Sequence, residues 1–347
     1  MRHFSLGFLT ALLVLVNSSA MAATPERDEA VIQGVNYIGV AVSNLAQASA
    51  FYSAAVDLES VQSGLLENNA ALDRIAGRSG VKAHTHLLKS VNSQVRLMQF
   101  ENPSQLAQNS PRVEVNGPGI AHICYQVATD TRAYQQFLDL GASHIGEREL
   151  VQLNPANPVV YAYARDTDEI MFEVEHIDFD AISRPRKHDY RIRHISLATP
   201  NIDSMVGFYS ILIEEPEPRR SGTTTRLSGE AFDKVSGLPG TELEMAWFQV
   251  RNLELEIIQY HSHTPEQPSN PRPIDALGYN LVMFDAANLD AASDLVVRAG
   301  GILVSEPQEM DGGRAFFARD PDGNLLGFQE VASQSPVSSR NFADNGT

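Results

Sequence analysis

Hydrophobic and polar positions along the chain form a strand-turn-helix pattern that occurs twice. The stretches are 35-VNYIGVAVSNLAQASAFYSAAVDL-58 and 192-IRHISLATPNIDSMVGFYSILIEE-215. In each, apolar residues alternate along a strand, a turn carries Asn44 or Asn201, and a helix follows with Phe-Tyr near its end. A period of two that changes to a helical period predicts a strand followed by a helix in both places.

A second pair of similar stretches lies between the first two and after them. Residues 117–142 and 276–301 again read as a strand and a helix. They are followed by 165-RDTDEIMFEVE-175 and 319-RDPDGNLLGFQE-330, where Asp-Pro-Asp-Gly predicts a tight turn before a last strand. Because internal similarity of this kind marks repeated supersecondary units, the chain reads as four modules in the order A-B-A′-B′.

Each module is expected to contain one strand, one helix and about three further strands. The predicted organisation comprises a first domain at 33–177 (modules 33–103 and 117–177), a linker at 178–190, a second domain at 191–331 (modules 191–263 and 276–331) and a tail at 332–347.

The N-terminal segment has the features of a secretory signal peptide over residues 1–22. Arg2 precedes an apolar run from Phe4 to Val16, and Ala20-Met21-Ala22 provides a small-x-small cleavage site. The run is shorter than the roughly 20 residues that span a bilayer. We therefore expect a periplasmic or secreted protein with no membrane contact after cleavage.

Composition and charge narrow the classes of function. The chain has 43% hydrophobic and 20% charged residues, which is typical of globular proteins. Its 43 acidic residues against 26 basic ones disfavour a nucleic acid partner. The basic stretch 184-RPRKHDYRIR-193 is interpreted as part of a solvated linker. Cys124 is the only cysteine, so no intramolecular disulfide can form.

The βαβββ repeat, its Phe-Tyr helices and its Asp-Pro-Asp-Gly-Asn-Leu-Leu closing turn resemble the vicinal oxygen chelate (VOC) superfamily. That superfamily includes glyoxalase I, methylmalonyl-CoA epimerase and extradiol dioxygenases. The resemblance covers residues 33 to 331. It implies an α+β fold in which four βαβββ modules form two VOC domains with cupped mixed sheets.

The resemblance also implies metal ligands on the first and last strands of each module. Modules 2 and 3 keep candidate ligands, which are His122, Glu173, His194 and Glu256. Modules 1 and 4 carry non-ligand residues at the matching positions, which are Tyr37, Arg96, Leu281 and Gly327. Since module 4 has lost both ligands, the pattern resembles a fused glyoxalase I dimer. In that arrangement module 2 pairs with module 3 and module 1 with module 4, which gives one metal site and one cup without a metal.

Two imidazoles and two carboxylates suit a borderline divalent ion, and Zn, Ni, Mn and Fe(II) remain open. A carboxylate facing apolar neighbours, as Glu256 does on its alternating strand, is costly unless it binds a metal or is neutralised. A hydrogen-bonded core histidine is the alternative for His122 and His194. Nearby Met245, Trp247 and Tyr260 are interpreted as either pocket or core residues.

The resemblance implies a lyase or isomerase that acts on a small carbonyl compound through a metal-stabilised enediolate. Glu173 is the first candidate for the proton-shuttling base, and Glu256 is the second. An Fe(II)-dependent ring-cleavage dioxygenase and a non-catalytic periplasmic small-molecule binding protein are the alternatives. A small molecule is the expected partner, and the fused modules would let a single chain act as a monomer.

Overall fold

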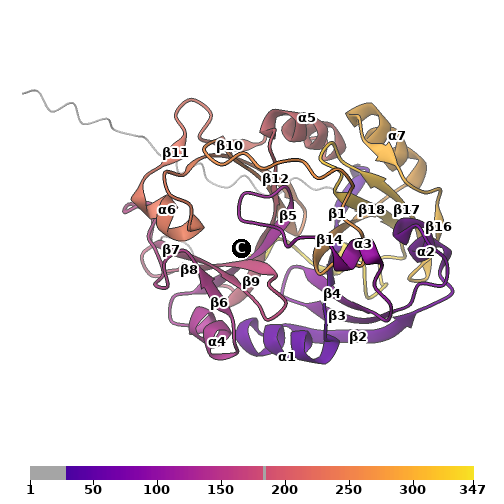
Figure 1. Ribbon diagram of the computed structural model, residues 1–347, viewed down its shortest axis with the longest axis horizontal. Helices are drawn as coiled ribbons and strands as arrows, with labels where there is room; N and C mark the ends of the chain where they lie inside the picture. Colours follow the sequence, from indigo (N-terminus) through magenta and orange to yellow (C-terminus); the bar gives the residue numbers. More distant parts are fainter. Residues whose placement is uncertain (1–28, 183–184) are drawn as a thin grey trace, which may run out of the picture.

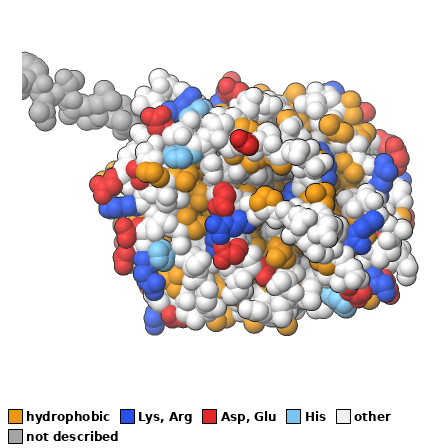
Figure 2. Space-filling view, viewed as in Figure 1, with side chains coloured by type: hydrophobic (Ala, Val, Ile, Leu, Met, Phe, Trp, Pro, Cys, Tyr) orange, Lys and Arg blue, Asp and Glu red, His pale blue; other side chains and the backbone are white. Residues whose placement is uncertain are grey.

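The computed structural model describes residues 29–182 and 185–347 (Figure 1). The predicted signal peptide at 1–22 lies outside the described residues. Within the described part of the chain, no helix is both long and apolar enough to cross a membrane. On the face shown in Figure 2, acidic and basic side chains are interspersed.

The elements of the first two modules follow the predicted order of strand, helix and three strands. They are β1 (Ile32–Ala41), α1 (Leu45–Val56), β2 (Glu59–Leu66), α2 (Ala70–Ala76), β3 (Ala83–Lys89), β4 (Gln94–Phe100), α3 (Gln105–Gln108), β5 (Gly119–Ala128), α4 (Ala133–Asp139), β6 (Ser143–Ile145), β7 (Val159–Arg165) and β8 (Met171–Ile177).

The second half of the chain repeats this order with a few short additions. Its elements are β9 (Tyr190–Ala198), α5 (Ile202–Leu212), β10 (Arg219–Ser221), β11 (Leu227–Ser228), α6 (Glu230–Ser236), β12 (Glu242–Val250), β13 (Leu253–Tyr260), β14 (Gly278–Ala286), α7 (Leu289–Ala299), β15 (Ile302–Leu303), β16 (Gln308–Met310), β17 (Gly313–Arg319), β18 (Leu325–Glu330) and the 3-10 helix η2 (Ser339–Asn341). The prediction of four βαβββ modules in an α+β fold is confirmed.

The strands form two mixed sheets of nine strands each. Sheet 1 has the order β15-β17-β18-β14-β1-β4-β3-β2, with β16 beside β17. Sheet 2 has the order β10-β12-β13-β9-β5-β8-β7-β6, with β11 beside β12. In every module the first strand pairs in parallel with the last, while β1–β14 and β5–β9 join two modules in antiparallel fashion.

This strand order combines module 1 with module 4 and module 2 with module 3, as the fused-dimer arrangement implies. Each sheet therefore takes strands from both halves of the chain. The boundaries of 33–177 and 191–331 divide the sequence, and they do not separate one sheet from the other.

One large apolar core lies between the two sheets and contains the inner sides of α1, α4, α5 and α7. Helix α1 of sheet 1 packs against α4 of sheet 2, and α5 packs against α7 in the same way (Figure 1). The opposite faces of the sheets are the cups, and each holds a smaller apolar cluster of its own. The first-strand residues that face a cup are thus kept apart from the main core.

The Phe-Tyr helix of one module is hydrogen-bonded to the closing turn of another module in two places. The Tyr52 hydroxyl at the end of α1 donates to Asp166 in the closing turn of module 2, at 2.7 Å. Tyr209 of α5 donates to Asp320 of module 4 at 3.1 Å. Because each pair joins an element of one sheet to a turn of the other, the motifs hold the two sheets together.

Asparagine caps and the C-terminal residues complete the fold. Asn44 and Asn201 accept hydrogen bonds from the backbone of the first turns of α1 and α5, which is how an N-cap stabilises a helix start. The predicted tail at 332–347 is packed, because Ser338 and Ser339 are fully buried and both donate to Asp285 of β14.

Candidate metal centre

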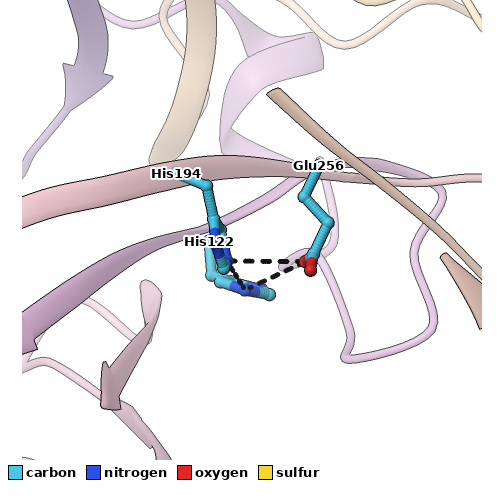
Figure 3. A group of neighbouring side chains, drawn as sticks. All are labelled: His122, His194 and Glu256. Carbon is cyan, nitrogen blue, oxygen red and sulfur yellow. Dashed lines mark hydrogen bonds and ion pairs between the residues drawn. The ribbon is translucent and has the colours of Figure 1, made fainter. Parts of the chain in front are cut away.

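The four predicted ligands meet in the cup of sheet 2. His122 and His194 lie on the adjacent central strands β5 and β9, while Glu173 and Glu256 lie on the flanking strands β8 and β13. The two imidazole Nε2 atoms are 3.4 Å apart (Figure 3). The tertiary structure therefore brings together residues that are up to 134 positions apart in the sequence.

Both carboxylates face the pair of imidazole nitrogens. Glu173 Oε2 lies 3.1 Å from Nε2 of His194 and 3.4 Å from Nε2 of His122. Glu256 Oε2 lies 3.5 Å and 3.8 Å from the same two atoms. All four donors thus point at one place, each contributed by a different strand.

The site is enclosed by protein. The exposed fraction is 1% for His122, 2% for His194, 4% for Glu256 and 6% for Glu173. On one side lies the apolar cluster of the cup, which includes residues of α6. Two buried carboxylates cannot remain charged at this depth without compensating positive charge.

Electrostatic coupling between the four groups is strong. Burial by itself would raise the pKa of Glu173, but hydrogen bonds from the two imidazoles hold it well below its ordinary range. Burial would lower the pKa of His194, yet the nearby charges of Glu256 and Glu173 raise it. The protein alone therefore draws positive charge to the centre of this group.

Trp247 of β12 positions one of the carboxylates. Its indole Nε1 donates to Glu256 Oε1 at 2.9 Å, and its ring is 7% exposed. Tyr260 and Met245, by contrast, belong to the apolar cluster of the cup. Of the three residues interpreted as either pocket or core, Trp247 is the one that donates a hydrogen bond to a candidate ligand.

The interpretation of 184–193 as a solvated linker is wrong at its end. Arg193 lies in β9 at a register shift next to His194, and its guanidinium pairs with Glu175 at 2.5 Å and with Glu254 at 3.4 Å. Arg191 is 8% exposed. Strict alternation along β9 would direct Arg193 and His194 to opposite faces of the sheet. The register shift at Arg193 changes this direction, and it cannot be seen in the sequence.

Arg219 of β10 was also missed by sequence reasoning. It pairs with Glu254 at 3.3 Å, and its guanidinium stacks 3.9 Å from the ring centre of Trp247. Strand β10 is too short to show an alternation of apolar and polar residues, so the sequence does not indicate these contacts of Arg219. Together with Arg193 it forms a charged layer beside the candidate ligands.

The cup of sheet 1 holds the four positions that lack ligands, and it contains an internal ion pair. Arg96 Nη1 lies 2.8 Å from Asp311 Oδ2 and 2.9 Å from the Tyr37 hydroxyl. The side chains of Arg96 and Asp311 are 3% and 7% exposed. A guanidinium therefore provides the positive charge in this cup.

The other two positions in sheet 1, Leu281 and Gly327, are closely packed against apolar side chains. Leu281 is buried in the apolar cluster. A Cβ at Gly327 would lie 2.6 Å from Met283 Sδ and 3.1 Å from the ring of Phe317. No side chain longer than hydrogen fits at this closing-strand position without a shift of Met283.

The residues in sheet 2 fit a divalent metal ion. Metal bonds of about 2.0–2.1 Å at a tetrahedral angle place two nitrogens about 3.4 Å apart, which is close to the observed separation. The nitrogens of His122 and His194 and a carboxylate oxygen of Glu256 all lie within 4.8 Å of one another. Two carboxylates with two neutral imidazoles also carry the charge that a divalent cation would balance.

Comparisons with known proteins agree with this architecture. Residues 191–328 match the family model of the Glyoxalase/Bleomycin resistance protein/Dioxygenase superfamily. No curated protein matches the chain significantly.

Among solved structures, glyoxalase I from Zea mays is similar with a TM-score of 0.55 at 14% identity, over 86% of this chain and 92% of that one. A proposed dioxygenase from Bacillus subtilis is similar with a TM-score of 0.53 at 9% identity, over 86% of this chain and 85% of that one. Both likenesses concern the fold. Residues 191–328 thus match the model of the Glyoxalase/Bleomycin resistance protein/Dioxygenase superfamily, and the chain as a whole has the two-sheet fold seen in glyoxalase I from Zea mays.

Proposed function

We propose that the protein is a metal-dependent enzyme of the lyase or isomerase type that acts on a small carbonyl compound. The observation that carries the proposal is the convergence of two imidazole nitrogens and two carboxylates on one buried point. Two separate imidazole–carboxylate pairs would not require each carboxylate to face both nitrogens, as Glu173 and Glu256 do here. When bound, a divalent ion would supply Lewis-acid polarisation of a substrate carbonyl.

His122, Glu173, His194 and Glu256 would hold the ion. Glu256 is the more firmly fixed of the two carboxylates, because the Trp247 indole donates to its second oxygen. Glu173 has the imidazoles and the Cys124 thiol as its neighbours. A carboxylate without a rigid partner is better suited to move toward a substrate, so Glu173 is the residue that we assign to proton transfer.

The protein supplies three further contributions to such a reaction. Hydrogen bonds from the imidazoles lower the pKa of Glu173 and so keep its carboxylate in the ionised form that a proton acceptor needs. The apolar cluster excludes water on one side of the site, which strengthens electrostatic interactions there. The charged layer of Arg193, Arg219 and Glu254 forms the other side, where Arg219 is the more exposed guanidinium.

We further propose that the enzyme works outside the cytoplasm and as a single chain. Export is supported by the basic, apolar and small-residue regions of residues 1–22. A single chain is supported by the two sheets, since one copy contributes all four candidate ligands.

Metal content and proton exchange test the proposal. His122→Ala and His194→Ala should each lose the metal that the wild-type protein retains, because each removes one of two nitrogen donors. Tyr37→Phe is the matched control, since Tyr37 occupies the position of His194 in sheet 1, and it should keep the metal. Metal retention in both histidine variants would contradict the proposed centre.

The reaction type is tested with the metal-loaded protein and a panel of α-hydroxy and α-oxo carbonyl compounds in deuterated water. Wild type should exchange the proton on the carbon next to the carbonyl, and Glu173→Gln should keep the metal but lose the exchange. Oxygen uptake that depends on a substrate would instead indicate a dioxygenase. Binding of a compound without any exchange would indicate a binding protein.

A further inference from the structure

The single cysteine of the chain lies inside the candidate metal centre. Cys124 is on β5, two residues after His122, and is fully buried. Its Sγ, a nitrogen of His194 and a carboxylate oxygen of Glu173 all lie within 4.8 Å of one another. This second group shares His194 with the group of His122 and Glu256, so the thiol lies on the side of the centre that Glu173 and His194 form.

The other cup shows where a side chain at this position reaches. Cys124 is the partner of Glu173 in the β5–β8 ladder, and Met283 is the partner of Gly327 in the equivalent β14–β18 ladder. The Met283 sulfur lies 2.6 Å from where a Cβ at Gly327 would be. A side chain at this register position therefore points at the ligand position of the closing strand.

The hydrogen-bonding neighbours of the Cys124 thiol are the candidate ligand Glu173 and, more weakly, Glu175. Its hydrogen-bonding neighbour Glu175 is 3.9 Å away, at the long limit for sulfur. Glu175 is already bound by Arg193 at 2.5 Å and by Gln126 at 2.9 Å. Since Cys124 is the only cysteine, it cannot form a disulfide within the chain. The thiol is thus available as a metal ligand in the cup.

We propose that Cys124 supplies a thiolate donor to the ion, which makes this centre selective for thiophilic divalent metals such as Zn²⁺ and Co²⁺. The inference rests on the proposed function, because it needs an ion at the histidines. Zinc–sulfur bonds of about 2.3 Å and zinc–nitrogen bonds of about 2.0–2.1 Å separate two donors by about 3.6 Å at a tetrahedral angle. Because the sulfur lies within 4.8 Å of the neighbouring donors, shifts of about 1.2 Å or less would bring it into range.

Metal selectivity follows from the softness of the donors. Carboxylates and imidazoles alone accept Mn²⁺ or Fe²⁺ as well as Zn²⁺, whereas a thiolate strongly favours zinc-like ions. When the ion binds, the metal–sulfur bond replaces the sulfur–hydrogen bond and the proton leaves to solvent. No oxidant or reductant takes part.

The test is cobalt substitution of the whole protein under anaerobic conditions. Thiolate bound to Co²⁺ produces an intense near-ultraviolet charge-transfer absorption, while nitrogen and oxygen ligands produce only weak visible bands. Wild type should show both, and Cys124→Ser should bind one equivalent of Co²⁺ with the visible bands alone. Met283→Leu is the matched control, because it alters the equivalent sulfur in the other cup, and it should retain the charge-transfer band.

Competition between ions gives an independent readout. The preference of the wild type for Zn²⁺ over Mn²⁺ should fall at least about tenfold in Cys124→Ser, as expected for loss of a group that supports the metal. Circular dichroism and thermal melting of each variant show whether it is folded. If the variant fails to fold, the wild-type spectrum decides alone.

The outcomes separate this inference from the proposed function. Stoichiometric Co²⁺ binding to the wild type without a charge-transfer band would refute the role of Cys124 and leave the histidine and glutamate centre intact. Absence of any Co²⁺ binding would refute both. A charge-transfer band that persists in Cys124→Ser would also refute the assignment, since the protein has no second cysteine.

Discussion

The ion pair in the cup of sheet 1 provides a stability prediction that does not depend on metal. Arg96 and Asp311 are 2.8 Å apart, with side chains 3% and 7% exposed. Asp311→Asn removes one charge with little change of shape. Asp311 has a φ of 54°, a left-handed conformation that asparagine also tolerates, so the substitution introduces no backbone strain.

The expected loss follows from what remains around the guanidinium. Removing one partner of a buried pair costs about 3–5 kcal/mol, because the other charge is left uncompensated. Arg96 would keep the Tyr37 hydroxyl at 2.9 Å and the Tyr37 ring at 4.0 Å from its guanidinium carbon. Asp311 also accepts from Gln329 at 3.0 Å, and this bond would weaken. We therefore expect a loss of about 3 kcal/mol in the free energy of unfolding.

Urea denaturation of the metal-free protein measures this loss. Glu230→Gln is the control, because it breaks the Glu230–Lys234 pair whose side chains are 82% and 44% exposed. Solvent screens such a surface pair, so this control should leave the free energy of unfolding almost unchanged. The double variant Arg96→Met with Asp311→Asn should recover part of the loss, since it removes the buried charge altogether.

Two results would refute this reasoning. A loss below about 1 kcal/mol in Asp311→Asn would mean that Arg96 is not balanced by this carboxylate. An altered metal content in Asp311→Asn would mean that the cup of sheet 1 acts on the centre in sheet 2.

Four further predictions concern the site, its pH dependence and processing. Trp247→Phe should weaken metal binding about 10–100-fold, because Glu256 loses its indole donor; competition with a chromophoric chelator measures this. The neighbouring carboxylates raise the pKa of His194 in the metal-free protein, so metal binding near neutral pH should release a proton, and calorimetry in buffers of different ionisation enthalpy should detect it. Burial raises the pKa of Asp320 to about 7, so the folded state retains a proton that the unfolded state loses. The free energy of unfolding should therefore fall by at most about 1.4 kcal/mol per unit as pH rises from about 4 to 7, and Asp320→Asn should flatten this slope in urea titrations. Mass spectrometry of the exported protein should show cleavage after Ala22, and an intact N-terminus would contradict export by this route.

Much of the fold was predictable because the four modules repeat the same local pattern. Strand periodicity, asparagine caps and closing turns depend on neighbours within a few residues, and such features can be read along the chain. Tyr37 and His194 occupy matched positions, which indicates that the fold does not require an imidazole there. This difference between the modules is enough to single out the candidate ligands from the sequence.

Contacts across the sheets could not be predicted in the same way. Arg193 was assigned to a solvated linker, yet a register shift in β9 turns it into the cup beside His194. From the sequence, Trp247 could be interpreted as either a pocket or a core residue, because its hydrogen bond to Glu256 depends on the pairing of β12 with β13. The Arg96–Asp311 pair joins residues 215 positions apart, and no local pattern indicates it.

The amino-acid sequence by itself determined the modules, their order and the types of donor that face each cup. Only the tertiary structure decided how close these donors lie and what surrounds them. The physical reason is that side-chain direction along a strand follows a local period of two, whereas the meeting of strands from different modules depends on sheet order and bulges. His194 therefore shows its chemistry in the sequence, but its neighbours His122, Glu173 and Cys124 are set by the β5–β9 and β5–β8 pairings.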